Sequence, residues 1–448
     1  MDPGKFRRTK VRDQKYRFKM INVKGIRKLF SNEYVFSLIT KCFMVVIGLA
    51  ESALLARYLG VDLRGDLSYI YSVASTAYFV ITFGIYTAYP FKRRDPSLDL
   101  QELLNEFMTI TSVLFIIYAV IFFSACAVFA SFNQTMAVIL FMLPIMGYDN
   151  VSSYVALIEN PNKMNAVTVI VNIVQLLYLV ALIIFFEGNL LAGAGYYLIG
   201  CIIKSVYFTW KLHFRFEIRL FSFKKLFEYM KFGFFPMLAM LLTTLNYRLD
   251  VIMLKQFDFI TSAQIGIYSI GIGLSEKAFL IPDAIKDVLL SKLAKGKKED
   301  EVARAMRICF LAGFVTAIAI TVLGGLVIKL LYGSEYAGAE IITYISVWGT
   351  ITMVFFKMIS QYNVVEHKQH LNVIFLSAAI IINCVLNLLL IPALGTNGAA
   401  IATSIGYCVS ACIFLIYFKR VSGLPFKKMV FVQKEDTDLI KNMLVGNR

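Results

Sequence analysis

The sequence contains few of the residues that soluble enzymes and metalloproteins use for chemistry. Only 17% of the 448 residues are charged, and only three are histidine. There is no GxxxxGK[S/T] phosphate loop and no serine or cysteine nucleophile motif. His367 and His370 form an HxxH pair in a polar loop that offers fewer ligands than a metal site requires. The DTD stretch that begins at Asp436 is expected to lie in a solvated tail. We therefore expect neither an enzyme nor a bound metal or other cofactor.

Cysteine is present in an odd number and without a CxxC pair. All seven cysteines fall inside apolar stretches, at Cys42, Cys126, Cys201, Cys309, Cys384, Cys408 and Cys412. An odd set in hydrophobic segments is typical of small packing residues. We therefore expect no disulfide framework and no structural zinc site.

Hydrophobic residues, in contrast, make up 58% of the chain and recur in long runs. A helix of about 20 apolar residues crosses the roughly 30 Å hydrocarbon core of a bilayer. Each backbone polar group in lipid must find its partner within the segment, so helices are expected. The sequence predicts an all-α integral membrane protein of about twelve transmembrane helices. The expected spans are 34–57, 67–90, 104–130, 135–158, 165–186, 190–211, 227–254, 264–290, 305–331, 338–362, 370–392 and 396–418.

Basic residues are concentrated in alternate loops, which indicates the orientation in the membrane. Short cytoplasmic loops of membrane proteins are enriched in Lys and Arg. With a cytoplasmic N-terminus, that side carries the basic segments 5–28, 92–94, 211–225, 292–298 and 419–428. We therefore predict that both termini are cytoplasmic, and that Arg64 lies in an outer loop. These membrane-proximal segments explain the net charge of +16, so we expect contacts with membrane lipids and none with nucleic acid.

The two halves of the chain resemble each other in sequence. One constant offset pairs Glu159 with Glu366, Asn165 with Asn372, Leu182 with Leu389, Gly188 with Gly395, and Ala192 with Ala399. Internal repeats of this kind are common in transporters. Six spans in each half imply a pseudo-two-fold axis along the membrane normal, with a cavity between the halves. We predict a basic tail (1–30), a six-helix bundle (31–215), a second six-helix bundle (216–420) and a cytoplasmic tail (421–448).

Cationic side chains inside the spans are candidates for substrate binding. A charge at the bilayer centre costs about 3 kcal/mol, so it is expected to face a cavity or a partner. Several Lys and Arg side chains around a cavity suit a phosphate or pyrophosphate. The alternative is that ion pairs brace the helices, with Arg248 held by Asp250 of its own helix. The candidate cations are Lys41, Arg57, Lys204, Arg248, Lys277 and Lys357.

Acidic residues in the spans are candidates for binding a coupling proton or sodium ion. Glu51, Asp149 and Glu276 are the residues we select. Residue counting places Glu276 and Lys277 near the bilayer centre, and Arg57, Arg248 and Asp250 near the outer interface.

Three further residues are expected to act as hinges. Gly233 and Pro236 weaken the helical hydrogen-bond ladder of the seventh span, and Pro282 does so in the eighth. Asp250, at the outward end of the seventh span, is a candidate gate residue.

Four stretches of the chain resemble one family of membrane proteins. They are ARYLGVDLRGDLSYIYSV, KFGFFPMLAMLLTTLNYRLDVIMLKQF, IGIYSIGIGLSEKAFLIPDAIKDVLLSKLAK and NCVLNLLLIPALGTNGAAIATSIGY. In this order they are similar to stretches of O-antigen and capsule oligosaccharide flippases. These flippases belong to the superfamily that also contains multidrug exporters and peptidoglycan-precursor flippases. The likeness extends from about residue 30 to residue 420.

The resemblance implies a flippase of the bacterial inner membrane. Such a protein moves undecaprenyl-pyrophosphate-linked oligosaccharide to the outer leaflet by alternating access. Polysaccharide polymerase and glycosyltransferases are the protein partners that this role implies, and a proton or sodium gradient is the implied energy source. Two alternatives stay open, namely an ion-coupled multidrug or small-solute exporter and a non-transporting scaffold of an envelope-polymer assembly.

Overall fold

The computed structural model describes residues 33–131, 133–294 and 299–436, and these residues form helices without any strand. The basic tail expected at 1–30 lies outside them. The first half of the chain forms α2 (Glu33–Thr82), η1 (Ile85–Ala88), α3 (Tyr89–Lys92), α4 (Leu100–Phe129), α5 (Gln134–Glu159), α6 (Pro161–Phe185) and α7 (Leu190–Lys211). The second half begins with η2 (Ile218–Leu220), α8 (Phe223–Leu254), α9 (Ser262–Ser275), η3 (Glu276–Phe279) and α10 (Leu280–Ala294). It continues with α11 (Glu299–Leu331), η4 (Ser334–Tyr336), α12 (Ala339–Val365), α13 (Gln369–Ser422) and α14 (Phe426–Val430).

The described helices account for the twelve predicted spans. Ten helical segments are long and apolar enough to cross a membrane. Two of them, α2 and α13, each contain two spans joined at a kink, at Gly60 (φ 69°) and Gly395 (φ 59°). Glycine has no Cβ and takes up positive φ without strain. The prediction of an all-α membrane protein built from two six-helix bundles is confirmed.

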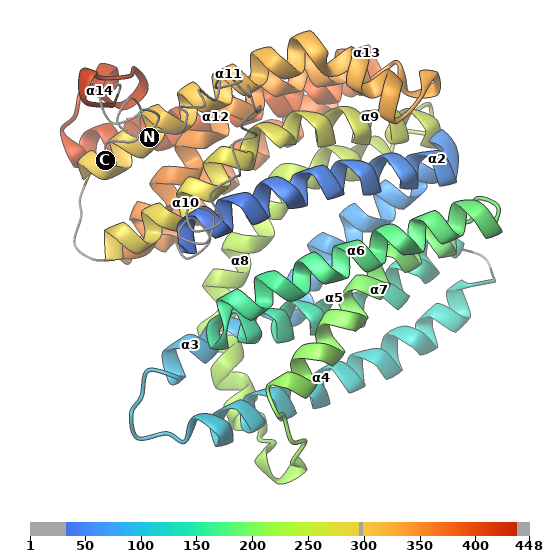
Figure 1. Cartoon of the computed structure of the whole chain (residues 1–448), viewed down its shortest axis with the longest axis vertical. Coiled ribbons are helices and arrows are strands. Elements are labelled where there is room, and N and C mark those ends of the chain that lie inside the picture. Colours follow the sequence, from blue (N-terminus) through green and yellow to red (C-terminus); the bar gives the residue numbers. More distant parts are fainter. Residues whose placement is uncertain (1–32, 132, 295–298, 437–448) are drawn as a thin grey trace, which may run out of the picture.

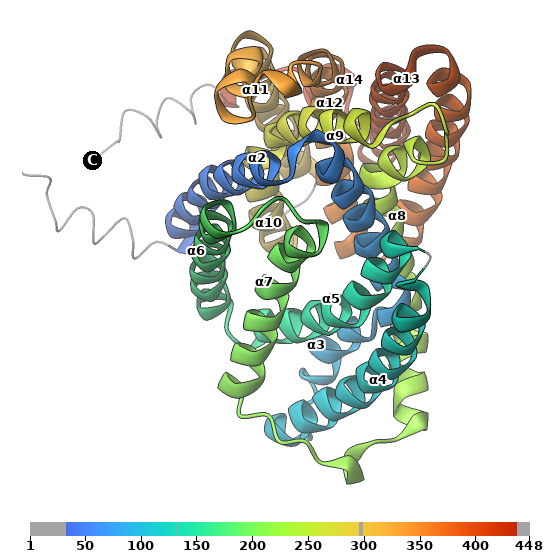
Figure 2. The ribbon, with the colours of Figure 1, turned by 90° about the vertical axis from the view of Figure 1, so that its right-hand side faces the viewer.

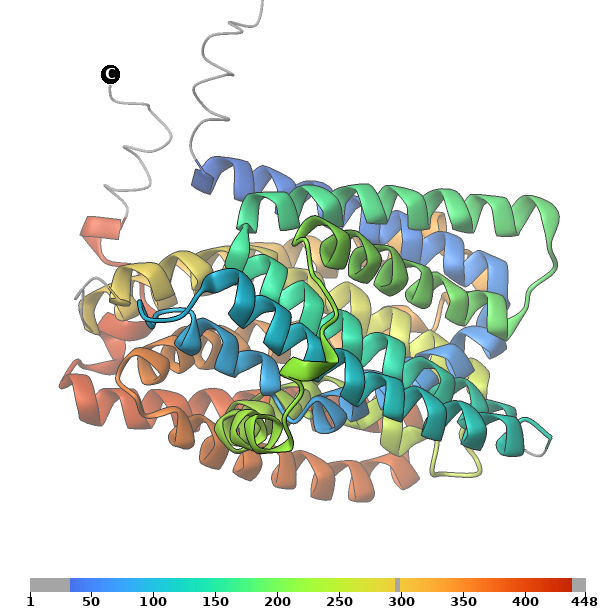
Figure 3. The same cartoon turned by 90° about the horizontal axis from the view of Figure 1, so that it is seen from below.

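The helices form two groups, with α4 to α7 in one group and α9 to α13 in the other (Figures 1 and 2). Helix α2 lies between them and packs on both. Seen from below, the long helices run in similar directions, whereas the yellow-green coil of α8 is viewed nearly end-on (Figure 3). Helix α8 therefore crosses from one group to the other.

Each half of α8 packs on a different bundle. In its first half, Lys92 Nζ lies 2.6 Å from Glu228 Oε1, and a Cβ on Gly233 would lie 2.4 Å from the Gly84 carbonyl oxygen. In its second half, Asp250 accepts a hydrogen bond from Tyr268 of the second bundle. The sequence analysis assigns α8 to the second bundle as a whole, whereas the structure gives it contacts with both.

The two bundles meet where α2, just after its kink at Gly60, contacts the start of α9. A Cβ on Gly65 would lie 1.7 Å from the Ser262 carbonyl oxygen, and one on Gly266 would be similarly obstructed by the backbone of α2. Asp66 Oδ1 is 2.8 Å from Lys255 Nζ and accepts a 2.6 Å hydrogen bond from Ser262 Oγ. We call Gly65, Asp66, Lys255, Ser262 and Gly266 the closed end. In the expected orientation it is the outer end, and α3 and α14 lie at the opposite end (Figure 1).

The C-terminal segment differs from the prediction of a solvated tail. The Asp436 side chain is buried and binds Arg307 of α11 through two hydrogen bonds, of 2.5 and 2.8 Å. Burial alone would raise the pKa of the Asp436 carboxyl, but hydrogen bonds from Arg307 and from the Gln433 N–H hold it below its ordinary value. A charged segment looks solvated in the sequence because the partner on α11 is far away along the chain.

Candidate functional site

A polar cavity lies between the two bundles. It has two adjoining chambers of about 300 and 180 Å³, and Tyr71, Arg248 and Glu276 line both. The larger chamber is completed by Ser75, Tyr78, Phe79, Thr244, Tyr247, Phe279, Asp283 and Lys357. The smaller chamber extends toward α9 and is lined by residues that include Ser52, Arg64, Ser68, Ser72, Lys277 and Tyr332. We call the two chambers together the central cavity.

Arg248 and Glu276 meet in this cavity. The Arg248 Nη2 atom is 3.8 Å from Glu276 Oε2, which joins α8 to the η3 turn. Residue counting places these two side chains at different depths, because it ignores the tilt of α8. The alternative in which Arg248 pairs with Asp250 is wrong, since Asp250 instead accepts hydrogen bonds from Tyr268 and, at 3.3 Å, from Thr403.

Two further cations face the central cavity without a carboxylate partner. Among the described residues, no carboxylate oxygen lies within 4.0 Å of Lys277 Nζ. Arg64 is only 9% exposed, and its Nε and Nη1 atoms are buried without a hydrogen-bond partner. The sequence analysis places Arg64 in an outer loop. The signal for its true position is Gly60, since a helix that restarts after this kink carries Arg64 into the next span.

The smaller chamber therefore has an excess of positive charge. Arg64, Arg248 and Lys277 line it, and Glu276 is the one carboxylate among its described lining residues. Unpaired cations in a low-dielectric site attract anions strongly, and guanidinium groups bind phosphate oxygens through two parallel hydrogen bonds. The arrangement is chemically suited to a phosphate or pyrophosphate group.

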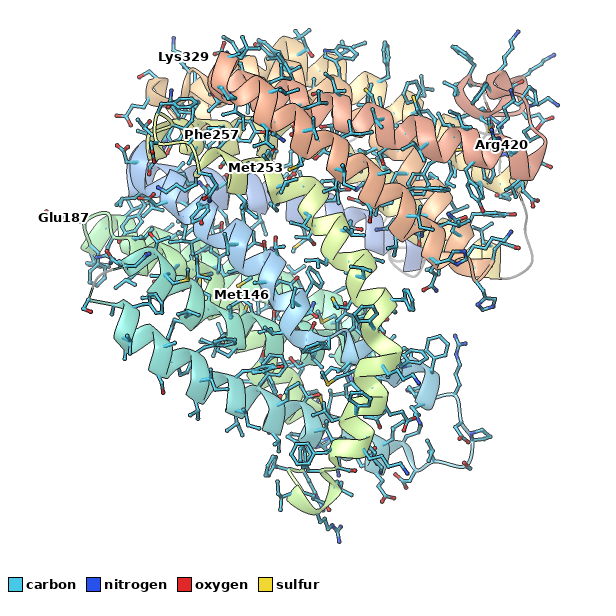
Figure 4. All side chains as sticks on the ribbon, turned by 180° about the vertical axis from the view of Figure 1, so that it is seen from behind. Met146, Glu187, Met253, Phe257, Lys329 and Arg420 are labelled. Atoms are coloured by element: carbon cyan, nitrogen blue, oxygen red, sulfur yellow. The ribbon has the colours of Figure 1, made fainter. Side chains whose placement is uncertain are left out.

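A second pocket of about 450 Å³ opens inside the first bundle, and we call it the N-bundle pocket. It shares Tyr71 with both chambers of the central cavity, so the three spaces adjoin. Lys204 Nζ lies 2.7 Å from Asp149 Oδ2 on its wall, and Ser153 donates a 2.8 Å hydrogen bond to the same carboxylate. Met146, labelled in Figure 4, also lines this pocket. Lys204 and Asp149, predicted separately as cation and coupling acid, thus form one ion pair.

The remaining predicted cations have different surroundings. Lys357 is buried, lies 2.6 Å from Asp283 Oδ1, and has its ammonium 3.8 Å from the centre of the Phe279 ring. Arg57 donates hydrogen bonds to the carbonyl oxygens of Leu330 and Leu331, at 2.7 and 2.8 Å. These carbonyls end α11, where a cation satisfies unpaired acceptors. Arg57 thus links the bundles. The side chain of Lys41 lies outside the described residues.

Two buried carboxylates lack a cationic partner among the described residues. Glu51 is 4% exposed and accepts a 3.0 Å hydrogen bond from Tyr196, while its Oε1 atom has no partner. Asp250 is 3% exposed and is held by hydroxyl and backbone donors. A buried carboxylate without an ion-pair partner is suited to binding a proton or a sodium ion.

The predicted hinge residues occupy distinct positions. Gly233 forms the close contact with Gly84 described above, and α8 stays helical through Pro236. The η3 turn immediately precedes α10, which contains Pro282, and this proline cannot donate a hydrogen bond to the carbonyl four residues earlier. The local departure from α-helix at Glu276 is therefore explained, while hinge motion stays a prediction.

A groove of about 710 Å³ lies on α4, α5 and α7 and is lined by side chains such as Phe115, Ile116, Ile202 and Trp210. No charged side chain lines it, so it lacks the chemistry to bind an anion. Within the described part of the chain, no three His, Cys, Asp or Glu residues lie close enough together to hold a metal ion.

The sequence of this chain matches one family profile and part of one characterised protein. The sequence profile of a family described as "Polysaccharide biosynthesis protein" matches residues 33–276. The lipid II flippase MurJ of Bacillus subtilis (strain 168) is 27% identical over 132 residues, which are 29% of this chain and 24% of that protein. The chain therefore matches about a quarter of that relative's length.

Solved structures share the fold at low sequence identity. A lipid II flippase MurJ in an inward closed conformation superposes with a TM-score of 0.70 and 15% identity, covering 92% of each chain. An inward-facing multidrug resistance MATE family transporter of the MOP superfamily gives a TM-score of 0.67 and 14% identity. That match covers 86% of this chain and 98% of the transporter.

Proposed function

The chain belongs to the polysaccharide biosynthesis protein family, and from this premise we propose that it is a flippase for lipid-linked oligosaccharide. Its substrate is an undecaprenyl-pyrophosphate-linked unit destined for a surface polysaccharide such as O-antigen or capsule. The observation that carries the proposal is the set of cations in the central cavity. The positive charges of Arg64, Arg248 and Lys277 outnumber the negative charge of Glu276 in the smaller chamber. A bound pyrophosphate would balance this excess.

The geometry of the two bundles supports a mechanism for this transport. The cations bind the pyrophosphate when the cavity is accessible from the cytoplasmic side, while the closed end blocks exit. The bundles then separate at the closed end, which breaks contacts such as the 2.8 Å ion pair between Lys255 and Asp66. This separation exposes the head group to the outer side. The lipid tail stays in the hydrocarbon during this exchange, because burying a long prenyl chain in water is strongly unfavourable.

This mechanism requires a bacterial cytoplasmic membrane with both termini on the cytoplasmic side. Reporter fusions after Asn133 and Gly333 are expected to report the outer side, and a fusion after Pro96 the cytoplasm, because of the distribution of basic loops. Alkaline phosphatase and fluorescent-protein fusions measure this directly. Inverted results at two of these positions would contradict the proposed orientation.

An ion gradient is the proposed energy source, since we expect no hydrolytic site. Glu51 and Asp250 are the best placed acceptors, because no cation pairs with them among the described residues. Asp149 and Glu276 are weaker candidates, since each is paired with a cation. Transport in proteoliposomes that responded to neither an imposed proton gradient nor an imposed sodium gradient would exclude coupling.

The experiment that tests the function is deletion of the gene in its host. Lipid-linked oligosaccharide is expected to accumulate and surface polysaccharide to disappear, with both restored by the wild-type gene. Mass spectrometry of extracted lipids measures the first effect. Unchanged lipid-linked intermediates together with increased drug sensitivity would instead favour the multidrug exporter. Genes for a polymerase and for glycosyltransferases beside this gene would support these enzymes as partners.

A further inference from the structure

The N-bundle pocket has a composition different from that of the central cavity. Among the described residues, the charged side chains that line it are Asp149 and Lys204, which form an ion pair, so their charges largely cancel. Planar amide side chains and tyrosine rings make up much of the rest. They come from α2, α5, α6 and α7 and comprise Asn150, Asn172, Gln175, Tyr71, Tyr78, Tyr154 and Tyr197. A pocket of this kind is suited to a neutral, hydroxyl-rich ligand.

Two of the three amide side chains of this pocket are poorly satisfied within the protein, whereas Gln175 donates a 2.9 Å hydrogen bond to the Tyr196 carbonyl oxygen. The Asn150 Oδ1 atom is buried and has no hydrogen-bond partner. Asn172 donates only to the thioether sulfur of Met44, at 3.4 Å, which is a weak acceptor. An unsatisfied buried polar group is costly, and native proteins keep few of them. The unpartnered Asn150 oxygen and the weakly bonded Asn172 amide are therefore available to bind a ligand.

The aromatic rings supply the second element that a sugar requires. A pyranose presents vicinal hydroxyl groups at its edge and an apolar C–H surface on its face. Amides and carboxylates bind the edge through paired hydrogen bonds, and aromatic rings pack against the face. Tyr71 and Tyr197 stack with their ring centres 4.3 Å apart beside the pocket. Both kinds of contact are therefore available in one place.

We propose that the N-bundle pocket binds the sugar of the lipid-linked substrate while the cations of the central cavity bind its pyrophosphate. The pocket volume of about 450 Å³ falls in the range of roughly 300–1,000 Å³ typical of ligand pockets. The pocket and the cavity share Tyr71 and are therefore adjacent, as binding of one ligand by both requires. This inference rests on the proposed function and adds that selection among sugars is made by the first bundle.

The test compares two lipids bound to the purified full-length protein in lipid nanodiscs. One is undecaprenyl pyrophosphate without sugar, and the other is the sugar-bearing lipid extracted from the deletion strain. Asn150→Ala and Asn172→Ala are each expected to weaken binding of the sugar-bearing lipid about ten- to hundredfold, as for a lost ligand hydrogen bond. Binding of the sugar-free lipid is expected to stay unchanged. Gln134→Ala, which removes an exposed amide at the start of α5, is the matched control.

Each outcome separates this inference from the proposed function. Wild-type protein that bound both lipids equally, or variants that bound both like the wild type, would overturn the sugar site and leave the flippase proposal intact. Variants that lost both lipids to the same extent would indicate a structural role and would also overturn it. Wild-type protein that bound neither lipid would overturn the proposed function itself. Asn150→Ala is the most informative variant, because no hydrogen bond within the described protein is lost at its carbonyl oxygen.

Discussion

Arg248→Glu is expected to lower transport at least about a hundredfold while the protein still reaches the membrane. The substitution places a second carboxylate beside Glu276, which lies 3.8 Å from the native guanidinium. It also reverses the charge offered to a pyrophosphate. Like charges brought together cost several kcal/mol. The variant therefore has two repelling carboxylates in the cavity, and these also repel the pyrophosphate. Export of surface polysaccharide in the deletion strain measures the effect, with membrane abundance measured in parallel.

The swapped double variant separates ligand binding from helix bracing. Arg248→Glu combined with Glu276→Arg restores an ion pair between α8 and η3 but moves the positive charge to the other helix. If the pair only braced the helices, the swap would recover transport, as double-mutant analysis detects. We expect no recovery. Arg420→Glu is the matched control, because Arg420 is exposed at the far end of α13 (Figure 4). Full transport in the swapped variant would contradict the role of Arg248 in binding.

Local properties of the sequence were enough to predict the architecture. Span length follows from hydrophobic runs and so does not depend on tertiary contacts. The orientation inferred from the positions of Lys and Arg stays a prediction. Glycines between adjacent spans also signal their tight connections. Gly395 joins two spans into the single helical element α13. In the internal sequence repeat it corresponds to Gly188, and this repeat is the basis for predicting two bundles.

The site could be predicted only in part, because depth and direction of a side chain are tertiary properties. The sequence identified Arg248, Glu276 and Lys277 as charges that need a partner, and all three line the central cavity. It did not identify Arg64, since an arginine near a span end looks like a loop residue. Nor did it foresee that Arg57 binds the end of α11, which requires knowledge of which helix ends meet.

The amides of the N-bundle pocket were missed for a related reason. Asn150 and Asn172 lie in apolar spans. The free energy of inserting a neutral amide into a membrane is smaller than that of a charge, so an amide is a weaker sign of function in a sequence. Their importance becomes visible only when the structure shows which polar atoms are left without partners. A search of membrane spans for amides as well as charges would have found them.

The closed end explains how access to the cavity from one side is blocked. Backbones of α2 and α9 approach so closely that a Cβ on Gly65 would lie 1.7 Å from the Ser262 carbonyl oxygen. Small residues allow such approach in membrane helices, where packing replaces the hydrophobic effect as the driving force. The contact also brings Asp66 within 2.8 Å of Lys255. In the proposed alternating-access cycle, these contacts break once in every turnover.

Gly65→Val is therefore expected to shift the protein toward the state that is open at this end and to abolish transport. Overpacking costs about 1–3 kcal/mol, which corresponds to a roughly five- to hundredfold change in the population of the closed state. A cysteine introduced at Ser72, which lines the smaller chamber, reports the shift in a variant without native cysteines. Labelling by a membrane-impermeant thiol reagent from outside the cell is expected to rise, and transport to fall.

Gly48→Val is the matched control, because Gly48 also lies in α2 and a Cβ there would meet nothing within 4 Å. It introduces the same β-branched residue without touching the second bundle, so labelling and transport are expected to stay near wild type. Gly65→Ala gives a graded test, since its single methyl group already overlaps the Ser262 carbonyl oxygen. If Gly65→Val is abundant in the membrane, transports normally and leaves the Ser72→Cys thiol as protected as before, contact between Gly65 and Ser262 is not part of the gate. Rising external labelling in the order Gly48→Val, Gly65→Ala, Gly65→Val would instead identify the approach of α2 to α9 as the step that closes the cavity.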